Sequence, residues 1–221
     1  MVRCRSQRPK DESVASGIYE ILKDILDFCW NDGSLYLVTS QGLFESRIVR
    51  KTEGKHDFVL CLLNPEPVVR GKIAHLCSDG KTNLYFSVNQ RKVVHHDLVA
   101  KKTSLIKEYS VVNRLFLRYG YLWICRLWDD IICYDLKTNE ERVISMEGKD
   151  QSEFSNSYVT DLVLKDNRTF YLTTWNGLYK LRFDNDNLCK SPFVLTLLTK
   201  NEKAFHSSIE NKMTSLFWDD K

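Results

Sequence analysis

The chain has few glycines and prolines and no long apolar segment, and these shortages exclude several classes of protein. With 9 Gly and 4 Pro in 221 residues, it is neither collagen-like nor of low complexity. No stretch approaches the roughly 18 consecutive apolar residues of a membrane-spanning helix. Residues 1–10 carry charges, but no apolar run follows them, as it would in a signal peptide. We therefore expect a soluble, unsecreted chain.

An excess of charge of one sign is also lacking. The chain has 32 Lys and Arg against 29 Asp and Glu, a formal net charge of +3, and no basic block longer than a few residues. This balance argues against nucleic acid or a membrane surface as a partner. Hydrophobic residues make up 43% of the chain and charged residues 28%, which suffices for the core of one large domain or two small ones and excludes a disordered chain.

Cysteine motifs of the metal-binding or redox type are absent. The seven cysteines never form a Cys-x-x-Cys pair, and they lie at Cys4, Cys29, Cys61, Cys77, Cys125, Cys133 and Cys189. An odd number cannot pair fully within one chain. Most of them sit in alternating apolar runs, where cysteine behaves as a small buried hydrophobic residue. We favour that packing role over a redox role.

Catalytic signatures are missing as well. The sequence contains no GxGxxG, GxxxxGK[ST], HExxH or GxSxG string. The run His95-His96-Asp97 suggests metal ligands, but adjacent residues of a strand point to opposite faces of the sheet, so both imidazoles cannot easily reach one ion. Asp129-Asp130 and Asp219-Asp220 meet the same objection. We expect no enzyme, no metal and no cofactor, although a fold alone never excludes chemistry.

What the sequence does contain is a repeated segment. Four copies begin at Ile25, Ile73, Val112 and Val159, and a fifth begins at Met213. Each opens with an apolar residue and has another three places later. The spacing is close to the roughly 40 to 50 residues of a propeller blade and is too long for a leucine-rich repeat.

Turn residues and alternation divide each copy into strands. A tight turn follows the first strand at Asn31-Asp32-Gly33, Ser78-Asp79-Gly80, Tyr119-Gly120 and Asp166-Asn167. The second strand alternates and carries an aromatic residue at one fixed place, which we expect to be buried between blades: Tyr36, Tyr85, Trp123 and Tyr171. A third strand follows, and apolar runs from Phe58, Thr103, Arg142 and Phe193 supply a fourth. The pattern predicts an all-β fold, a β-propeller with four full four-stranded antiparallel blades.

The two ends depart from this pattern. We expect residues 1–16 to be disordered or weakly ordered, and residues 17–221 to form a partial propeller domain with repeats starting near 25, 73, 112, 159 and 213. Residues 17–22 resemble an unpaired outer strand, and residues 213–221 stop after a first strand. Such an arc leaves open edges, so it belongs to a longer chain or associates with itself. Alternatively, the two ends pair and close a small ring.

Two of the copies carry the fuller motif, an Asp, a Gly or Asn turn, an aromatic strand and T-x-x-G-L. They run through Thr39-Ser40-Gln41-Gly42-Leu43 and through Thr174-Trp175-Asn176-Gly177-Leu178. This motif resembles the two-component regulator propeller repeat. In the other two copies Ser87–Lys92 and Cys125–Asp130 replace T-x-x-G-L, so only period and strand pattern remain. We expect Gly42 and Gly177 to occupy the same turn with positive φ.

The resemblance implies a place in the extracytoplasmic sensor region of bacterial hybrid two-component histidine kinases. In that family the sensor responds to glycan breakdown products, and the kinase end controls genes for their use. The present sequence shows no signal peptide, transmembrane helix, β-sandwich domain or kinase motif, so we expect it to perform only the sensor part of that family's function. Seven cysteines are more than an oxidising periplasm favours.

The loops between second and third strands should all emerge on one face of the propeller, and we call their polar and aromatic residues the predicted rim. The predicted rim consists of Gln41, Arg91, Arg126, Trp128, Asp129, Trp175 and Asn176. Amide, guanidinium, carboxylate and indole groups suit a carbohydrate or other small polar ligand. Against this, loops are generally polar, and Trp128 can instead pack between blades.

Two functions remain open. The first is a non-catalytic ligand- or signal-sensing propeller segment, which would be periplasmic. The second is an intracellular, cytoplasmic scaffold whose protein partner binds the predicted rim or an exposed blade edge. An enzyme on a propeller scaffold is a third alternative.

Overall fold

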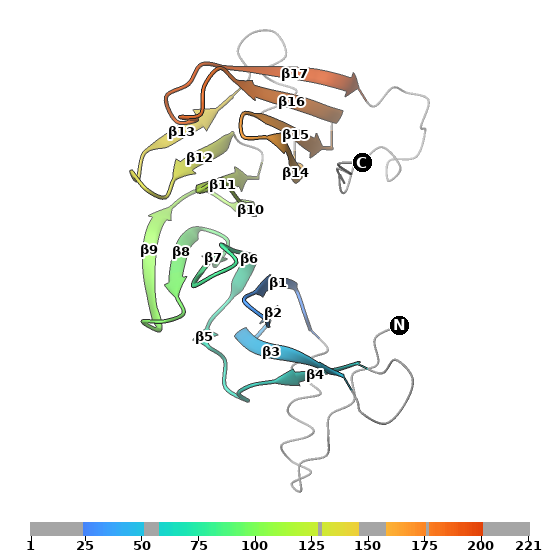
Figure 1. Ribbon diagram of the computed structural model, residues 1–221, viewed down its shortest axis with the longest axis vertical. Helices are drawn as coiled ribbons and strands as arrows, with labels where there is room; N and C mark the ends of the chain where they lie inside the picture. Colours follow the sequence, from blue (N-terminus) through green and yellow to red (C-terminus); the bar gives the residue numbers. More distant parts are fainter. Residues whose placement is uncertain (1–23, 51–57, 128–129, 146–157, 176, 201–221) are drawn as a thin grey trace, which may run out of the picture. The chain divides into compact units, whose positions relative to one another are not determined.

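The computed structural model describes residues 24–50, 58–127, 130–145, 158–175 and 177–200. These residues form an all-β protein whose strands pair into four antiparallel sheets (Figure 1). More than a third of the chain lies in strands. The described part contains no helix that could cross a membrane. The chain divides into an N-terminal unit, residues 1–109, and a C-terminal unit, residues 110–221.

The N-terminal unit holds two sheets. The first follows the order β1 (Asp27–Asn31), β2 (Ser34–Thr39), β3 (Gly42–Arg50) and β4 (Phe58–Leu62), and β5 (Val69–Arg70) pairs with β3. The second follows the order β6 (Ile73–Ser78), β7 (Asn83–Val88), β8 (Lys92–Asp97) and β9 (Lys102–Glu108). The repeat predicted four strands here, and β5 is an addition to them.

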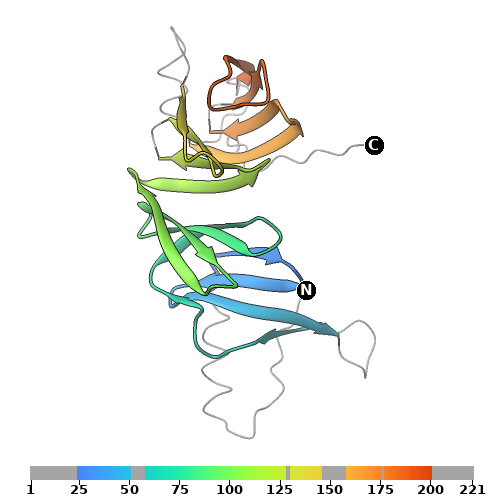
Figure 2. The ribbon, with the colours of Figure 1, turned by 60° about the vertical axis from the view of Figure 1, so that its left-hand side comes forward.

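The C-terminal unit also holds two sheets, which lie side by side in both ribbon views (Figures 1 and 2). One follows the order β10 (Val112–Arg118), β11 (Tyr121–Arg126), β12 (Ile131–Asp135) and β13 (Glu141–Ile144). The other follows the order β14 (Val159–Asp166), β15 (Thr169–Thr174), β16 (Gly177–Phe183) and β17 (Phe193–Lys200). Each sheet is the predicted four-stranded blade.

Two of the four tight turns after the first strands have consecutive residues of positive φ. Asp32 and Gly33 both have positive φ, 42° and 77°, and so do Tyr119 and Gly120, at 50° and 76°. Two consecutive residues of positive φ give a hairpin turn whose twist matches that of its strands. Glycine tolerates this geometry because it has no Cβ.

The glycines of the T-x-x-G-L motif also have positive φ, 145° at Gly42 and 149° at Gly177, as predicted. In both turns the preceding threonine hydroxyl bonds the glycine carbonyl: Thr39 Oγ1 donates to Gly42 O at 3.4 Å, and Thr174 Oγ1 donates to Gly177 O at 3.1 Å. A Cβ on Gly42 would collide with the carbonyl oxygen of Val69, because β5 lies against this end of β3. The motif therefore specifies a turn, and at Gly42 it also allows the backbone of β5 to lie close to β3.

The aromatic residues of the second strands occupy equivalent positions. Tyr36, Tyr85, Trp123 and Tyr171 are each the third residue of a six-residue strand. Tyr36, Tyr85 and Trp123 are buried, as predicted. The prediction is wrong for Tyr171, which is half-buried. Its neighbours Phe170 and Leu172 face the core of the unit, so alternation turns Tyr171 to the opposite face of the sheet. Tyr85 is turned away from its core in the same way, but the ring of His95 stacks on it.

Both units are packed in the same way. In the N-terminal unit, Tyr36 and Val38 from the third and fifth positions of β2 share a core with Leu84 and Phe86 from the second and fourth positions of β7. In the C-terminal unit the same positions of β11 and β15 supply the core, with Trp123 and Cys125 against Phe170 and Leu172. The core of each unit thus lies between its two sheets.

Side chains also link the first strands of neighbouring sheets. Asp27 on β1 accepts a hydrogen bond from the backbone N–H of Leu76 at 2.8 Å, and Asn31 donates to the carbonyl of Lys81 at 2.7 Å. In the C-terminal unit Asn113 on β10 donates to the carbonyl of Val159 on β14 at 2.9 Å. In the N-terminal unit, Asp27 at the start of β1 meets Leu76 and Asn31 at its end meets Lys81, which follows β6, so these strands run in the same direction. Equivalent turns within a unit therefore lie at the same end.

Residues 17–22 and 213–221, where the sequence suggests further strands, lie outside the described residues, and so does the segment 1–16. The described cysteines are all free thiols. Cys125 and Cys133 are buried as predicted, whereas Cys29, Cys61, Cys77 and Cys189 are half-buried.

Candidate functional site

In the N-terminal unit, two residues of the predicted rim are exposed at turns between second and third strands. Gln41 lies in the β2–β3 turn, where its backbone N–H donates to Thr39 Oγ1 at 3.2 Å. Arg91 lies in the β7–β8 turn, and its guanidinium Nε is 3.6 Å from Glu108 Oε1. Both turns lie at the same end of the unit, but these interactions hold each residue to its own sheet.

In the C-terminal unit, two more residues of the predicted rim can be placed. Arg126 Nε donates to the carbonyl of Asp130 at 3.2 Å, so its guanidinium closes the β11–β12 turn. Trp175 is half-buried and stacks on Tyr158, with ring centroids 4.8 Å apart and an interplanar angle of 18°. Trp128, Asp129 and Asn176 lie outside the described residues. The structure therefore places four of the seven predicted residues and leaves their role in binding a prediction.

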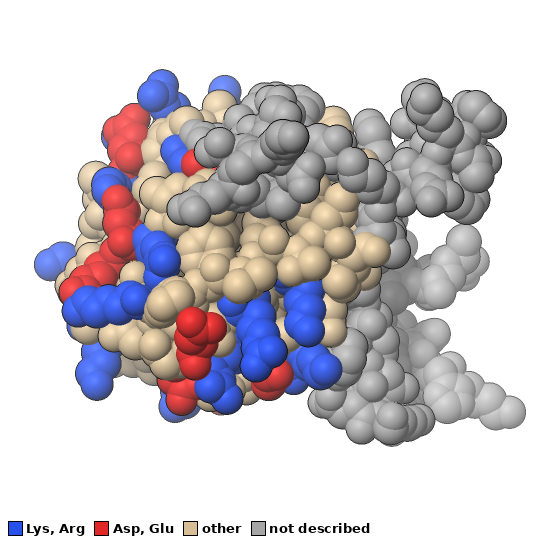
Figure 3. Space-filling view, turned by 90° about the horizontal axis from the view of Figure 1, so that it is seen from above, with Lys and Arg blue, Asp and Glu red and all other residues tan. Residues whose placement is uncertain are grey.

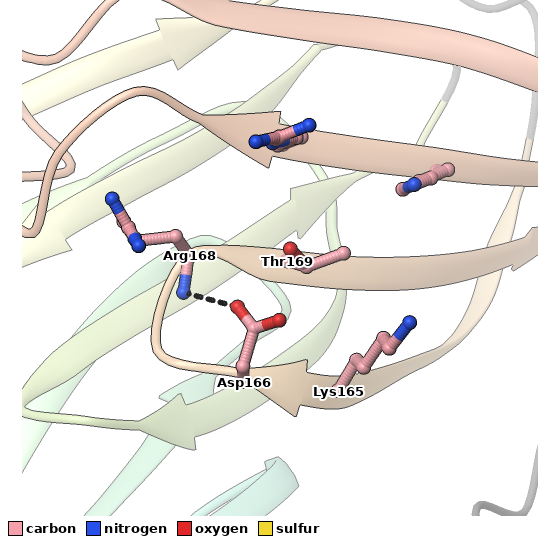
Figure 4. Close-up of a pocket in the computed structure, with 6 residues that line it drawn as sticks. Lys165, Asp166, Arg168 and Thr169 are labelled. Atoms are coloured by element: carbon pink, nitrogen blue, oxygen red, sulfur yellow. Dashed lines mark hydrogen bonds between the residues drawn. The ribbon is translucent and has the colours of Figure 1, made fainter.

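A pocket of about 220 Å³ lies at the opposite end of β15 from Trp175. We call it the basic pocket, and its lining consists of Lys165, Asp166, Arg168, Thr169, Lys180 and Arg182. Figure 4 shows Lys165 and Asp166 at the end of β14 and Arg168 and Thr169 at the start of β15. Four of the six side chains are cationic and one is anionic, so the pocket favours an anionic ligand.

Sheet register explains why these side chains converge. Thr169 is paired with Arg182, and Tyr171 is paired with Lys180, so all four lie on one face of the sheet. That face is opposite to the one where Phe170 and Leu181 enter the core. The alternation of β16 is the cause, because Tyr179, Leu181 and Phe183 take the core positions and leave Lys180 and Arg182 on the other side.

The turn between β14 and β15 is closed by Asp166. Its Oδ1 accepts the backbone N–H of Arg168 at 2.9 Å (Figure 4). Partial burial by itself raises the pKa of Asp166, but hydrogen bonds from the Arg168 backbone and from the hydroxyl and backbone of Thr169, together with the Lys165 charge, outweigh it. The pKa of Asp166 is therefore lowered. This carboxylate therefore stays ionised while it holds the turn, and it offsets only one of the four cationic charges of the basic pocket.

The cations of the basic pocket differ in their partners. Arg168 donates to the carbonyl of Asp184 at 3.2 Å and lies 3.6 Å from the Asp186 carboxylate. Among the described residues, Lys180 and Arg182 have no acidic partner. They are two residues apart on one strand, which separates them by about 6.6 Å along it. Seen from above, other Lys and Arg side chains also gather on the surface, with acidic ones among them (Figure 3).

An uncompensated lysine and arginine on a common strand face suit a carboxylate, sulfate or phosphate group. The guanidinium presents a fixed fork of donors that matches such oxygens, and the ammonium adds a mobile point charge. Thr169 adds no free donor, because its hydroxyl is already bonded to Asp166. In the described part of the chain no cluster of three or more metal-ligating side chains occurs.

The two adjacent histidines have separate partners. His95 Nε2 lies 2.6 Å from Asn83 Oδ1 and its ring stacks on Tyr85, whereas His96 Nδ1 lies 2.8 Å from Thr103 Oγ1. The rings therefore point to opposite faces of the sheet, as strand alternation predicts. Burial and the neighbouring His95 lower the pKa of His96.

The basic pocket was not predicted, because it lies at a turn between first and second strands, whereas the predicted rim includes only loops between second and third strands. The signal was present in the run Tyr179-Lys180-Leu181-Arg182-Phe183, where charged and apolar residues alternate. This alternation predicts one basic face. Arg168 and Asp166, by contrast, belong to a turn that strand periodicity does not describe.

Comparisons with known proteins show the fold. No protein-family model and no curated protein matches the sequence. The extracellular domain of BT4673 from B. thetaiotaomicron, described as a one-component system, is similar at 16% identity and a TM-score of 0.50, over 77% of this chain and 21% of that chain. The N-terminal domain of Nup159 is similar at 12% identity and a TM-score of 0.50, over 78% and 48%.

Apo AztD from Citrobacter koseri is similar at 12% identity and a TM-score of 0.52, over 80% of this chain and 48% of that chain. The present chain thus spans between 21% and 48% of the length of these three structures. Likeness at such low identity shows the fold, and the four sheets of this chain are propeller blades.

Proposed function

We propose that this chain is a non-catalytic, ligand-sensing propeller segment that binds an anionic ligand in the basic pocket. The observation that carries the proposal is the pair Lys180 and Arg182, which lie on one face of β16 without an acidic partner among the described residues. Two like charges on neighbouring positions repel each other, and an anion bound between them removes that repulsion. The ligand then stabilises the strand pair β15–β16.

The chemical class that we propose is a glycan fragment with a carboxylate or sulfate group. The T-x-x-G-L motif resembles the repeats of hybrid two-component sensors, and the fold is similar to an extracellular domain. The acid group would bind Lys180 and Arg182. On this proposal the chain lies outside the inner membrane and is part of the sensor region of a two-component system.

Calorimetric titration with a sulfated disaccharide, its uncharged counterpart and inorganic sulfate tests this function. We expect the charged sugar to bind, the uncharged one not to bind, and added salt to weaken the affinity. Lys180→Ala and Arg182→Ala should each weaken binding about tenfold, since a charge-assisted hydrogen bond is lost. Lys137→Ala, an exposed cation at the β12–β13 turn, is the matched control.

Three results would contradict the proposal. Binding that survives the double variant Lys180→Ala, Arg182→Ala places the ligand elsewhere, and Trp175→Ala then tests the predicted rim. Equal affinity for inorganic sulfate and for the sulfated sugar removes the glycan from the proposal. Turnover of the sugar during the titration would overturn the non-catalytic part.

A second candidate function is a scaffold for protein partners, and β1 favours it. Leu26 immediately precedes this strand, Phe28 and Trp30 continue the alternation on it, and the three are 65%, 64% and 55% exposed. Exposed apolar stripes of this kind mark interaction surfaces. Replacing Phe28 and Trp30 by Ser should abolish capture of a protein partner or self-association, measured by light scattering, while leaving sugar binding unchanged. An unchanged scattering mass would remove this candidate.

A further inference from the structure

Two cysteines that are far apart in the sequence meet between the sheets of the C-terminal unit. Cys133 lies on β12, paired with Trp123 on one side and with Arg142 on the other, and it is buried in the core. Cys189 lies in the connection between β16 and β17 and packs against the same core. The proposed function uses neither of them.

The connection that carries Cys189 is held firmly against the neighbouring sheet. The hydroxyl of Tyr121 on β11 donates to the carbonyl of Asp186 at 3.2 Å and accepts the backbone N–H of Leu188 at 3.3 Å. Arg142 on β13 donates to the carbonyl of Ser191 and lies over the ring of Phe193, 4.8 Å from its centroid. Cys189 is thus fixed at a short distance from β12.

The thiol of Cys189 lies against the strand that carries Cys133. Cys189 Sγ donates to the carbonyl oxygens of Cys133 and Glu140, each at 3.5 Å, and both cysteines pack in the same core cluster. Both cysteines are reduced. A disulfide requires two sulfurs that can meet at a suitable backbone separation, and here the Cys189 sulfur already lies against the backbone of Cys133.

Their environments divide the roles of the two thiols. The neighbouring Cys189 thiol and then burial raise the pKa of the Cys133 thiol. Cys189 is the more exposed of the two. An accessible thiol beside a buried second thiol is the arrangement of an attacking and a resolving cysteine.

We propose that Cys133 and Cys189 form a reversible disulfide when the protein meets an oxidised low-molecular-weight thiol. The Cys189 thiolate attacks the disulfide of the small molecule, forms a mixed disulfide and releases one small thiol. Cys133 then loses its proton and attacks the Cys189 sulfur, which releases the second small thiol. The protein loses two electrons and two protons, and the small disulfide is reduced to two thiols.

The bond would tie β12 of one sheet to the β16–β17 connection of the next. The hydrogen bonds from Tyr121 and Arg142 already hold this connection, so the disulfide forms without rearrangement of the sheets. Oxidation therefore locks the arrangement of the two sheets, and reduction releases it.

Incubation of the folded protein with glutathione disulfide, followed by alkylation in denaturant and peptide mass mapping, tests the proposal. We expect one cross-link, between Cys133 and Cys189, that dithiothreitol removes. The half-buried Cys29, whose pKa burial and Asp27 raise to about 12, should react at least about tenfold more slowly than Cys189. Cys125→Ser, which removes a buried thiol on β11, should still form the cross-link.

The two single variants give distinct outcomes. Cys133→Ser should leave Cys189 as a persistent mixed disulfide with glutathione, because the resolving thiol is gone. Cys189→Ser should leave Cys133 reduced. A lasting glutathione adduct on Cys189 of the unmodified protein, or full alkylation of Cys133 after oxidation, would overturn the proposal. The measurement on the unmodified protein needs no variant to fold.

Discussion

The N-terminal and C-terminal units use the same strand positions for different side chains. In both, the third and fifth residues of one second strand meet the second and fourth residues of the next. The N-terminal unit fills these positions with Tyr36 and Phe86 and with aliphatic residues. In the C-terminal unit Trp123 touches Phe170 and Phe183, at centroid distances of 4.6 Å and 6.1 Å. The blade is therefore defined by where apolar side chains point, and their identity varies.

The outward faces of the two units differ more than their cores. At β1 of the N-terminal unit, Phe28 and Trp30 and the preceding Leu26 are exposed, so this face is apolar. The outward face of the last sheet in the C-terminal unit carries Lys180 and Arg182 beside the half-buried Tyr171. An apolar face suits a packed partner, whereas a cationic face suits a small anion or water. On the two functions proposed above, ligand binding would fall to the C-terminal unit and protein contact to the N-terminal unit.

The largest expected effect is the loss of Trp123. Its side chain is fully buried and lies against two phenylalanine rings, so Trp123→Ala should lower the free energy of unfolding by about 3 to 5 kcal/mol. Urea unfolding measures this cost. The matched control is Tyr171→Ala, the same strand position on an outward face, which should cost clearly less.

Trp123→Phe separates packing from hydrogen bonding. The indole Nε1 of Trp123 is buried without a hydrogen-bond partner among the described residues, so phenylalanine removes an unsatisfied donor while keeping most of the ring contacts. This variant should unfold closer to the unmodified protein than Trp123→Ala does. Equal costs for Trp123→Ala and Tyr171→Ala would show that the core of the C-terminal unit is not where the structure places it.

The next effect concerns Gly42. Gly42→Ala forces a Cβ into positive φ and against the carbonyl oxygen of Val69, which should cost about 1 to 3 kcal/mol from the backbone alone and displace β5. Gly33→Ala is the control, because it also has positive φ but nothing lies within 4 Å of a Cβ there. We expect the control to cost about 1 kcal/mol. Thermal unfolding of both variants gives the difference, and equal costs would refute the close approach of β5.

The blades were predictable from sequence because their determinants are local and repeated. Turn residues such as Asp32-Gly33 and the alternation around Tyr36 and Trp123 each specify a strand or a reversal, and every copy of the repeat reinforces the others. The fourth strands from Phe58, Thr103, Arg142 and Phe193 were located in the same way. Strand β5 was missed because two residues are too few to show any alternation.

The candidate site was less predictable, since it depends on which face of the last sheet lies outward. Alternation alone places Lys180 and Arg182 on one face of β16. It does not tell which other side chains share that face, such as those of the β14–β15 turn. The contact between Cys133 and Cys189 joins residues from two blades and left no local signal, so the sequence analysis treated both as packing residues. The role of the predicted rim stays a prediction.

A smaller effect is expected from the hydrogen bonds between first strands. Asn113→Ala removes the donor to Val159 O, a buried bond between β10 and β14, and should cost about 1 kcal/mol or somewhat more. Asn31→Ala in the N-terminal unit should cost somewhat more, because buried Asn31 donates to Lys81 O and also accepts from the Ser78 hydroxyl, whereas Asn113 Oδ1 has no partner among the described residues. Urea unfolding at neutral pH compares them. A larger cost for Asn113→Ala would reverse the ranking of the two units.

The smallest effect distinguishes two turn aspartates, Asp79 in the N-terminal unit and Asp166 in the C-terminal unit. Partial burial alone raises the pKa of Asp79, but hydrogen bonds from the Asn83 side chain and from the backbone of Asn83, Lys81 and Thr82 outweigh it, so its pKa is lowered. A lowered pKa contributes stability above the unfolded value of about 3.9, and this contribution is lost as the pH falls through the folded value.

Asp79→Asn should therefore destabilise the protein at pH 7 by less than about 1 kcal/mol, since the carboxyl group is only partly buried. In acid, where the carboxyl group is protonated in both the folded and the unfolded state, the substitution should make no difference. Asp166→Asn should show the same sign with a smaller change, because Asp166 is exposed and accepts no side-chain amide, whereas Asp79 Oδ2 accepts the Asn83 amide at 2.6 Å. Urea unfolding between pH 7 and pH 2 measures both. If Asp79→Asn costs as much in acid as at pH 7, the loss comes from turn geometry rather than from the charge, and the turn needs the shape of aspartate more than its ionisation.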